Sequence, residues 1–596
     1  MKIEDKPIAE IRRRDSDEQS RQFWLAQGVA PWLAQVLSSR LGHDSDAVAQ
    51  ALLTPSLALL ADPEAIPDMT RAVARIAKAI VEGEAIIFAV DHDLDGQASA
   101  AVLWSAFVDY FKVDPALLGV VTSHRLTEGY GITEPVVERI LQSQASLIIS
   151  ADKGSSDEPR IHKLQLAGRD VIVTDHHTIP SEGPPKSAYA VVNPTRQESH
   201  YDPFVCGAAV AFLTMAKLRS YMLENNLRQQ IPSLSTLLDY VAVATIADCV
   251  ALRPDKSPSN RVFVKYGLRL LNSGKRACWQ VFKEQLNGPI SAESIAFQLA
   301  PPIAAAGRLD WAEAGFRFLT ATDRASAARH WSVLQQENQQ RKTIEAELRR
   351  RALQQVTPDQ GQSIVLYLED GHSGVHGITA SRLVETFGKP VAIFSPKPIA
   401  TDDPSGEASV ASGSFRGIPD FNVRQALQIV DERHPGLLLG FGGHVGAAGA
   451  SIEIANFERF AAAFEQATRE QLGQRELMPT LWVDGSLEKQ YINLHSVDQL
   501  LDLEPWGKDF PYPNFYGEFR VASINAIGDG THLRLQLEQQ GQVYNAIWFN
   551  ALPSAEASCP LQAGDTAGLI YQLKDNWFRG ERTLQLNILS IADSAM

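Results

Sequence analysis

Residues 85–96 read AIIFAVDHDLDG, an apolar run that ends abruptly in the aspartates Asp91, Asp93 and Asp95. The pattern returns in SLIISADKG at residues 146–154 and in DVIVTDHH at residues 170–177. Each run has the length of a buried β-strand and places acidic side chains after its carboxyl end. Because helical patterns such as SAAVLWSAFVDYF separate these runs, we predict a parallel sheet with helices on both faces.

The remainder of the chain divides into regions with different patterns. Apolar runs at SIVLYLE and PVAIFS indicate a second α/β domain, and a charged helical stretch before them is a candidate connector. On pattern alone, that stretch could equally be a solvated face with no linking role. The predicted domains are an amino-terminal helical segment that packs on the first α/β domain (1–82), that domain itself (83–310), the connector (311–358), the second α/β domain (359–474) and a β-rich domain (477–596).

The carboxyl-terminal region has the pattern of a small β-barrel. Turns rich in Gly, Asp and Asn separate five segments with strand-like patterns. They are EFRVASINAI (518–527), HLRLQLEQQ (532–540), YNAIWFN (544–550), AGLIYQLK (567–574) and TLQLNILSI (583–591). Five short strands of this kind suggest an OB-like fold. The predicted fold class is therefore α/β, with two α/β domains followed by a carboxyl-terminal barrel.

Composition narrows the functional classes. The 596 residues are 45% hydrophobic, and no stretch approaches the roughly 18 uninterrupted apolar residues that a membrane helix needs. The charged first residues lack the apolar core of a secretory signal, so we expect a cytoplasmic protein. The four cysteines have no CxxC spacing, which argues against structural zinc or disulfides. A net charge of −15 argues only weakly against nucleic acid, because an acidic protein can still carry a basic groove.

The acidic and imidazole side chains after the strands predict a metal site. They are Asp91, Asp93, Asp95, Asp152, Asp175, His176, His177 and, in TIADCVAL, Asp248. Any one of these acids alone could be a helix cap or a turn residue. Together they would be too costly to bury without cations, and hard oxygen ligands with a few imidazoles suit Mn²⁺ or Mg²⁺. We expect two such ions.

Two divalent ions at such a site could activate water and stabilise the leaving oxygen of an in-line displacement, which predicts phosphodiester hydrolysis. The chain contains no GxxxxGK[ST] loop, so the sequence does not support a nucleotide-driven motor.

These motifs resemble those of the DHH phosphoesterases and, within them, the RecJ-type exonucleases specific for single-stranded DNA. DHDLDG, ADKG, VTDHH and ATIADCVAL are similar to the four motifs of the first domain. Further similar segments include HRLTEGYGIT, VVNPT and AAAGRL, and in the second domain GITASRLVETFGKPVAIFS, GSFRGIPDFN and GFGGHVGAAG. The carboxyl-terminal LEPWGKDFPYPNF resembles the OB domain of that family. The resemblance covers nearly the whole chain.

The resemblance implies roles for particular residues. The implied metal ligands are Asp93, Asp95, Asp152, His176 and Asp248. The implied catalytic residues are His177, Asp175 and Asp91, with His177 contacting the scissile phosphate or orienting water. The implied substrate-binding residues are Arg125, Arg308, Ser381, Arg382, Ser414, Arg416, Gly443 and His444. Structural ion pairs are the alternative for Arg125 and Arg308, and ordinary turn chemistry is the alternative for the glycines.

The resemblance further implies degradation of single-stranded DNA from the 5′ end to mononucleotides, in recombination and repair, with single-strand-binding protein as an expected partner. Two alternatives remain. One is a DHH phosphodiesterase for short oligonucleotides or cyclic dinucleotides, against which the carboxyl-terminal barrel argues. The other is a catalytically impaired DNA-binding descendant. Three departures from the family pattern, at Ala89, Pro302 and Ala304, keep the second alternative open.

Overall fold

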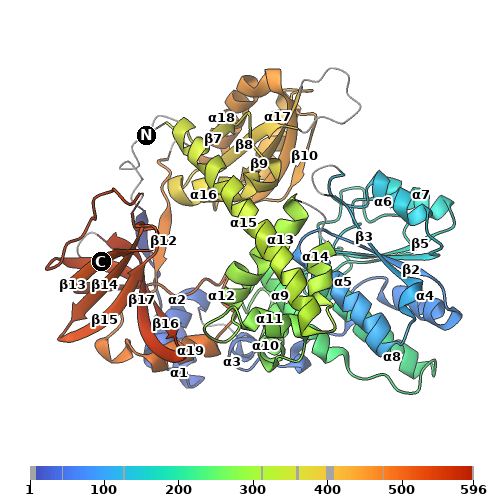
Figure 1. Ribbon diagram of the computed structural model, residues 1–596, viewed down its shortest axis with the longest axis horizontal. Coiled ribbons are helices and arrows are strands. Elements are labelled where there is room, and N and C mark those ends of the chain that lie inside the picture. The colour runs from blue at the N-terminus through green and yellow to red at the C-terminus, as the bar shows by residue number, and fades with distance from the viewer. Residues whose placement is uncertain are drawn as a thin grey trace. The chain divides into compact units, whose positions relative to one another are not determined.

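The computed structural model describes residues 9–42, 45–124, 128–309, 313–357, 361–397, 409–473, 475–552 and 554–592 (Figure 1). The chain forms two compact units. One comprises Arg14–Asn338 with Asp484–Met596, and the other comprises Gln339–Val483 with the short segment that ends at Arg13. Within the described residues, no helix has both the length and the apolar character needed to span a membrane.

The first unit contains a five-stranded sheet in which every strand is parallel to its neighbours. The strand order is β3-β2-β4-β5-β6. The strands are β2 (Ile86–Val90), β3 (Leu118–Thr122), β4 (Leu147–Ala151), β5 (Asp170–Thr174) and β6 (Ala190–Val192). Val90 pairs with Ala151, which in turn pairs with Thr174, so β2, β4 and β5 end at the same edge. The predicted parallel sheet is confirmed.

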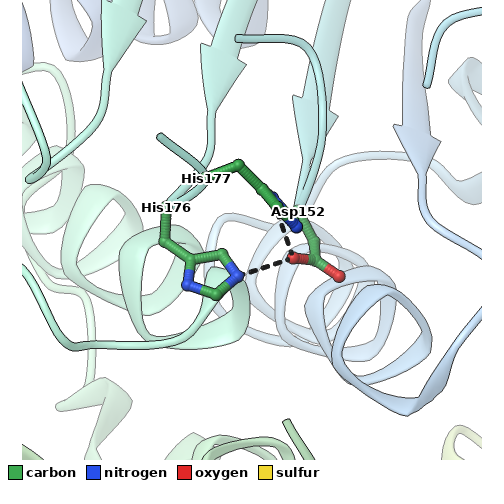
Figure 2. Close-up of side chains that lie close together, drawn as sticks. All are labelled: Asp152, His176 and His177. Atoms are coloured by element: carbon green, nitrogen blue, oxygen red, sulfur yellow. Dashed lines mark ion pairs between the residues drawn. The ribbon is translucent and has the colours of Figure 1, made fainter. Parts of the chain in front are cut away.

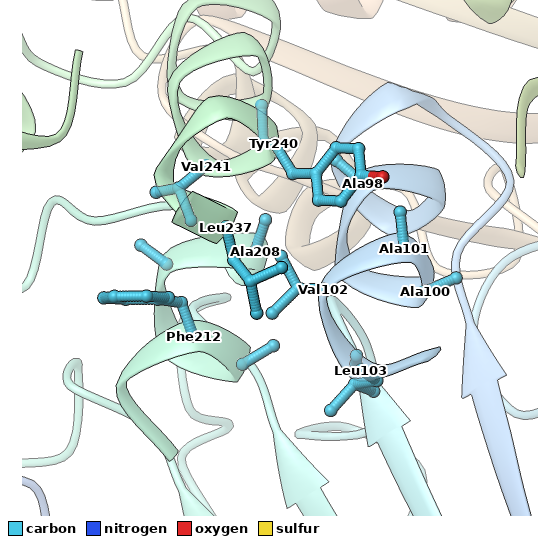
Figure 3. Packing of buried hydrophobic residues seen from close by; sticks show 14 of the residues in the cluster. Ala98, Ala100, Ala101, Val102, Leu103, Ala208, Phe212, Leu237, Tyr240 and Val241 are labelled. Atoms are coloured by element: carbon cyan, nitrogen blue, oxygen red, sulfur yellow. The ribbon is translucent and has the colours of Figure 1, made fainter. Parts of the chain in front are cut away.

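The helices around this sheet cover both of its faces or pack on the helices that do so. They are α4 (Met69–Glu82), α5 (Leu94–Ser105), α6 (Glu134–Leu141), α7 (Glu158–Leu166), α8 (Gly207–Glu224), α9 (Leu238–Ala247), α10 (Pro258–Ser273), α11 (Ala277–Lys283), α12 (Ala292–Ser294), α13 (Ala300–Leu309) and α14 (Glu313–Leu319). Apolar side chains of α4, α5, α8 and α9 form the core on one face, and α6 and α7 cover the other. Figure 3 shows the Tyr240 ring of α9 next to Ala98 of α5, and the small side chains of α5 let the two helices approach closely.

A 32-residue helix, α15 (Arg324–Gln355), leads from the first unit into the second. The second unit holds a mixed sheet in the order β10-β11-β9-β8-β7, in which only β7 and β8 are parallel. Its elements are β7 (Ile364–Tyr367), α16 (Ser373–Phe387), β8 (Val391–Pro396), β9 (Val410–Arg416), α17 (Val423–Arg433), β10 (Gly440–Gly443), β11 (Ala447–Glu453) and α18 (Phe457–Leu472). In the same unit, β1 (Glu10–Arg13) pairs in parallel with β12 (Thr480–Val483) as a separate two-stranded sheet.

The carboxyl-terminal strands close into the predicted barrel, in the order β13-β14-β15-β17-β16. Its elements are β13 (Phe515–Ile527), β14 (His532–Gln539), β15 (Gln542–Trp548), β16 (Thr566–Phe578), β17 (Glu581–Ala592) and the preceding helix α19 (Leu494–Asp502). Three amino-terminal helices, α1 (Glu18–Ala26), α2 (Pro31–Leu41) and α3 (Asp46–Leu53), contribute to the same apolar core. Trp24 and Trp32 are buried there with Phe515 and Phe519, so amino-terminal and carboxyl-terminal segments share one apolar core.

Candidate metal centre

The acidic residues of the site follow directly from the ends of the parallel strands. Asp91 comes immediately after β2, Asp152 after β4 and Asp175 after β5, and all three are buried. Asp152 has a φ of 61°, so the chain turns sharply as it leaves the sheet. The carboxyl ends of neighbouring parallel strands form a common edge, where ligands bind in open α/β sheets.

Two further aspartates lie at the start of α5. The Asp93 side chain caps this helix by accepting a hydrogen bond from the Gly96 amide at 3.1 Å. Asp95, in the first turn of the same helix, is buried and accepts hydrogen bonds from the Gly207 and Ala208 amides, each at 2.7 Å. The first turn of α8 therefore holds the Asp95 carboxylate in a fixed orientation.

His176 brings together acids from three different elements. Its Nε2 lies 3.2 Å from an Asp152 oxygen, 3.6 Å from an Asp248 oxygen and 3.8 Å from an Asp95 oxygen. Figure 2 shows the His176 and Asp152 side chains pointing toward one another from the ends of adjacent strands. Asp248 follows the last residue of α9, so this helix also delivers a carboxylate to the cluster.

His177 is held by Asp175. The Nδ1 atom of His177 lies 2.8 Å from Asp175 Oδ1, which also accepts hydrogen bonds from the amides of His176 and His177. Burial lowers the pKa of His177, but the charge of Asp175 outweighs it and raises that pKa to about 9. For Asp175, burial acts to raise the pKa, and the charge of His177 outweighs it so that the pKa is lowered. The pair fixes the His177 ring beside the acidic cluster.

The remaining acids repel one another. Burial, and next the charge of Asp93, raise the pKa of Asp95 to about 7. Burial and the charge of Asp95 raise the pKa values of Asp152 and Asp248. Asp91 differs because His92 counteracts the effect of burial and brings its pKa down to about 2. A cluster of this kind needs compensating positive charge.

The donor atoms fit divalent metal ions. Three overlapping groups each place one ligand atom per residue within 4.8 Å of the others. The groups are Asp152, His176 and His177; Asp95, His176 and Asp248; and Asp91, Asp93 and Asp152. Carboxylate oxygens with imidazole nitrogens suit Mn²⁺ or Mg²⁺, and Asp152 belongs to two groups, as a ligand that bridges two ions would.

The residues expected to bind substrate in the second unit lie on α16, on β9, at the end of β10 and directly after it. Ser381 donates to the Gly377 carbonyl oxygen at 3.0 Å, and Arg416 lies beside the same glycine. Ser414 pairs with Gly449 on β11, so these polar side chains lie near glycine-rich backbone. Arg382 is exposed and pairs with Glu385 at 3.1 Å.

The last expected residues of this set lie at the end of β10 and in the first unit. Gly443 has a φ of 142°, and a Cβ there would meet the Ala447 carbonyl oxygen at 2.4 Å. The His444 amide donates to the same carbonyl oxygen at 2.7 Å. Arg125 lies outside the described residues, and Arg308 belongs to α13, where only its backbone is described.

Three further residues lie at the cluster: Tyr130 and Asn193, which are not among the expected site residues, and Lys153, a departure from the family's second motif whose ammonium could bind phosphate or compete with an ion. The Tyr130 hydroxyl lies 3.0 Å from His177 Nε2. Asn193, in VVNPT, donates to the His177 carbonyl oxygen at 2.9 Å and so anchors the backbone of the motif. Lys153 is completely buried, and burial lowers its pKa while the charge of Asp91 opposes that shift. The segments EGYG and VVNPT were the available signals, since both resemble family motifs.

Comparison with family models identifies all three parts of this architecture. The DHH family N-terminal domain matches residues 85–245, the DHHA1 domain matches residues 360–470 and the RecJ OB domain matches residues 483–590. A parallel sheet with an acidic edge, followed by this second α/β domain, defines the DHH class of proteins.

Curated relatives narrow the class to one family. The single-stranded-DNA-specific exonuclease RecJ of Haemophilus influenzae is 32% identical over 553 residues, which cover 90% of this chain and 92% of the relative. RecJ of Escherichia coli is 30% identical over 98% of this chain and 99% of the relative. The chain belongs to the RecJ family.

Solved structures agree in fold. RecJ from Thermus thermophilus in complex with Mn²⁺ superposes with a TM-score of 0.77 at 24% identity, covering 98% of this chain and 80% of that structure. An exonuclease RecJ bound to manganese gives a TM-score of 0.55 at 30% identity, covering 68% of this chain and 94% of that structure. The second of these relatives was solved with manganese bound.

Proposed function

We propose that this chain is a metal-dependent exonuclease that degrades single-stranded DNA in the 5′ to 3′ direction to mononucleotides, in DNA recombination and repair. The observation that carries the proposal is the convergence of Asp91, Asp152 and His176 with Asp95 and Asp248 at one edge of the parallel sheet. The RecJ relatives, named for activity on single-stranded DNA, support the choice of substrate.

Each residue of the cluster has a proposed role. The ligands of two Mn²⁺ or Mg²⁺ ions are Asp93, Asp95, Asp152, His176 and Asp248. When bound, these ions would supply an activated water and charge stabilisation for the leaving oxygen. His177, oriented by Asp175, contacts the scissile phosphate or orients the attacking water, and Asp91 supports the adjacent ligands from the end of β2.

We assign the binding of the DNA strand to Arg125, Arg308, Ser381, Arg382, Ser414, Arg416, Gly443 and His444. Arginine binds phosphate through two parallel hydrogen bonds, and glycine backbone lets a phosphate approach its amides closely. The proximity of Ser381 and Arg416 to Gly377 supports a shared phosphate contact in the second unit.

The barrel favours long strands over dinucleotides. OB folds bind single strands along a β-surface, which a cyclic dinucleotide would not require. For the domains we retain the proposed boundaries 83–310, 359–474 and 477–596, with residues 1–82 as a helical segment and 311–358 as a connector. Single-strand-binding protein is a proposed partner, and the cytoplasm is the proposed location.

The test is digestion of one single-stranded oligonucleotide labelled at its 5′ end in one sample and at its 3′ end in another. Each sample receives Mn²⁺, Mg²⁺ or chelator. We expect labelled mononucleotide to leave the 5′ end at once, and only with metal. Early release from the 3′ end would refute the polarity. Binding without cleavage under any metal would instead favour a DNA-binding descendant.

A further inference from the structure

The Tyr130 side chain contacts both Asp152, which follows β4, and His177, which lies in the segment after β5. Its hydroxyl is 3.1 Å from His177 Nδ1 and 3.0 Å from His177 Nε2, and it donates to the Asp152 carbonyl oxygen at 3.3 Å. The Tyr130 and His177 rings meet edge to face with centroids 5.5 Å apart. The Tyr130 hydroxyl thus connects Asp152 with His177.

The backbone holds Tyr130 in this place. It lies between Gly129 and Gly131, whose φ values are +85° and +87°, a region that residues with side chains rarely adopt. A Cβ on Gly131 would be 2.7 Å from an Asp157 carboxylate oxygen, and the next amide, that of Ile132, donates to Asp157 Oδ2 at 2.7 Å. This close approach anchors the turn against the protein and directs the phenol to His177.

The hydrogen bond to Asp175 determines which nitrogen of His177 can bond to the Tyr130 hydroxyl. A carboxylate only accepts hydrogen bonds, so the 2.8 Å contact with Asp175 places a proton on His177 Nδ1. His177 Nε2 is then the atom available to Tyr130 or to a phosphate. A phenol has one proton and can also accept, so Tyr130 links the two groups by donating to the Asp152 carbonyl oxygen and accepting from a proton on His177 Nε2.

We propose that Tyr130 is a positioning residue whose hydroxyl holds the His177 ring in the orientation that the reaction needs. The inference rests on the proposed function, in which His177 contacts the scissile phosphate or the water. Tyr130 is half exposed. Removing only its hydroxyl therefore tests the hydrogen bonds to His177 and Asp152 while the ring stays in place. Asp175 fixes one side of the imidazole and Tyr130 fixes the other.

The test is Tyr130→Phe, which keeps the ring and removes only the hydroxyl. We expect kcat to fall roughly 5- to 10-fold, the effect of one lost hydrogen bond. KM, and strand binding measured by fluorescence anisotropy in chelator, should stay within about twofold because the ring remains. The matched control is Tyr110→Phe, which removes a phenol that bonds to Thr236 in the same domain and should leave kcat unchanged.

A double variant separates positioning from a general structural effect. If Tyr130 acts through His177, then Tyr130→Phe should cause no further loss in a His177→Ala background, measured in single turnover with excess enzyme. Losses that multiply in the double variant, or an unchanged kcat in the single variant, would overturn the inference alone. A wild-type chain that cleaves no strand would overturn the proposed function and this inference with it.

Discussion

Gly207 and Asp152 lie so close that a Cβ on Gly207 would be 2.6 Å from the Asp152 Cβ and 2.7 Å from its Oδ1. The same glycine donates its amide to Asp95, so the first turn of α8 is fitted against two candidate metal ligands. A residue with a side chain cannot occupy this position unless Asp152 moves.

Gly207→Ala should therefore weaken metal binding. Overpacking at a tight site costs about 1–3 kcal/mol, which corresponds to a loss of roughly tenfold or more in Mn²⁺ affinity if Asp152 is displaced. Isothermal titration calorimetry with Mn²⁺ measures the affinity of each variant. Gly440→Ala is the control, because a Cβ there would meet nothing within 4 Å. Equal Mn²⁺ affinity in the two variants would contradict the close fit.

Asp152→Ala should abolish cleavage and leave strand binding largely intact. The substitution removes a residue shared by two of the ligand groups, whereas the proposed strand contacts lie on other residues. Cleavage of a labelled oligonucleotide and anisotropy of the same oligonucleotide in chelator measure the two effects separately. If binding and the folded state are lost together, Asp152 is structural instead.

Asp484→Ala should destabilise the fold by about 3 kcal/mol, because it leaves the buried Arg40 guanidinium without its partner charge. The Nε and Nη2 atoms of Arg40 each lie 2.7 Å from an Asp484 oxygen, and Asp484 also accepts a hydrogen bond from the Asn514 amide. Urea unfolding measures the loss. Glu313→Ala breaks an exposed pair with Arg317 and should cost no more than about 1 kcal/mol. Similar costs for both variants would show that the buried pair contributes little.

The buried His376 of α16 should make the second unit less stable in acid. Burial lowers the pKa of His376 from 6.5 to about 4, and its Nε2 lies 2.9 Å from Ser395 Oγ. The unfolded chain therefore binds the proton more readily. The contribution is fully present above about pH 6.5 and declines as the pH falls toward 4, by up to about 3 kcal/mol.

Unfolding midpoints between pH 4 and 7 check this dependence. His376→Gln should flatten it, whereas His495→Gln, at an exposed histidine of α19, should not. A wild-type slope that survives in His376→Gln would assign the acid sensitivity to other groups.

The sequence predicted those parts of the site that follow directly from strand ends. Asp91, Asp152 and His176 come after short apolar runs, and parallel pairing necessarily brings such ends to one edge. The five barrel segments could also be predicted, because the alternation of apolar and polar residues along a strand is a local signal. The family resemblance supplied Asp248, whose place at the end of α9 has no local pattern of its own.

Contacts between distant segments could not be predicted in this way. Arg40 and Asp484 are 444 residues apart, and neither stands in a pattern that indicates its partner. The hydrogen bond between Tyr130 and His177 likewise depends on how the turn at Gly131 packs against Asp157, which no local pattern indicates. Such contacts arise from tertiary packing, which periodicity does not encode.

The shared core of the amino-terminal helices and the barrel has a consequence during synthesis. Trp32 of α2 donates to Gln499 at 3.0 Å, a residue 467 positions later in the chain. At a translation rate of about 5–20 residues per second, α2 leaves the ribosome roughly 20–90 s before its partner exists. Throughout that interval Trp32 lacks both Gln499 and Phe515, the ring that it meets edge to face in the folded protein, so this part of the core can form only after synthesis reaches the barrel.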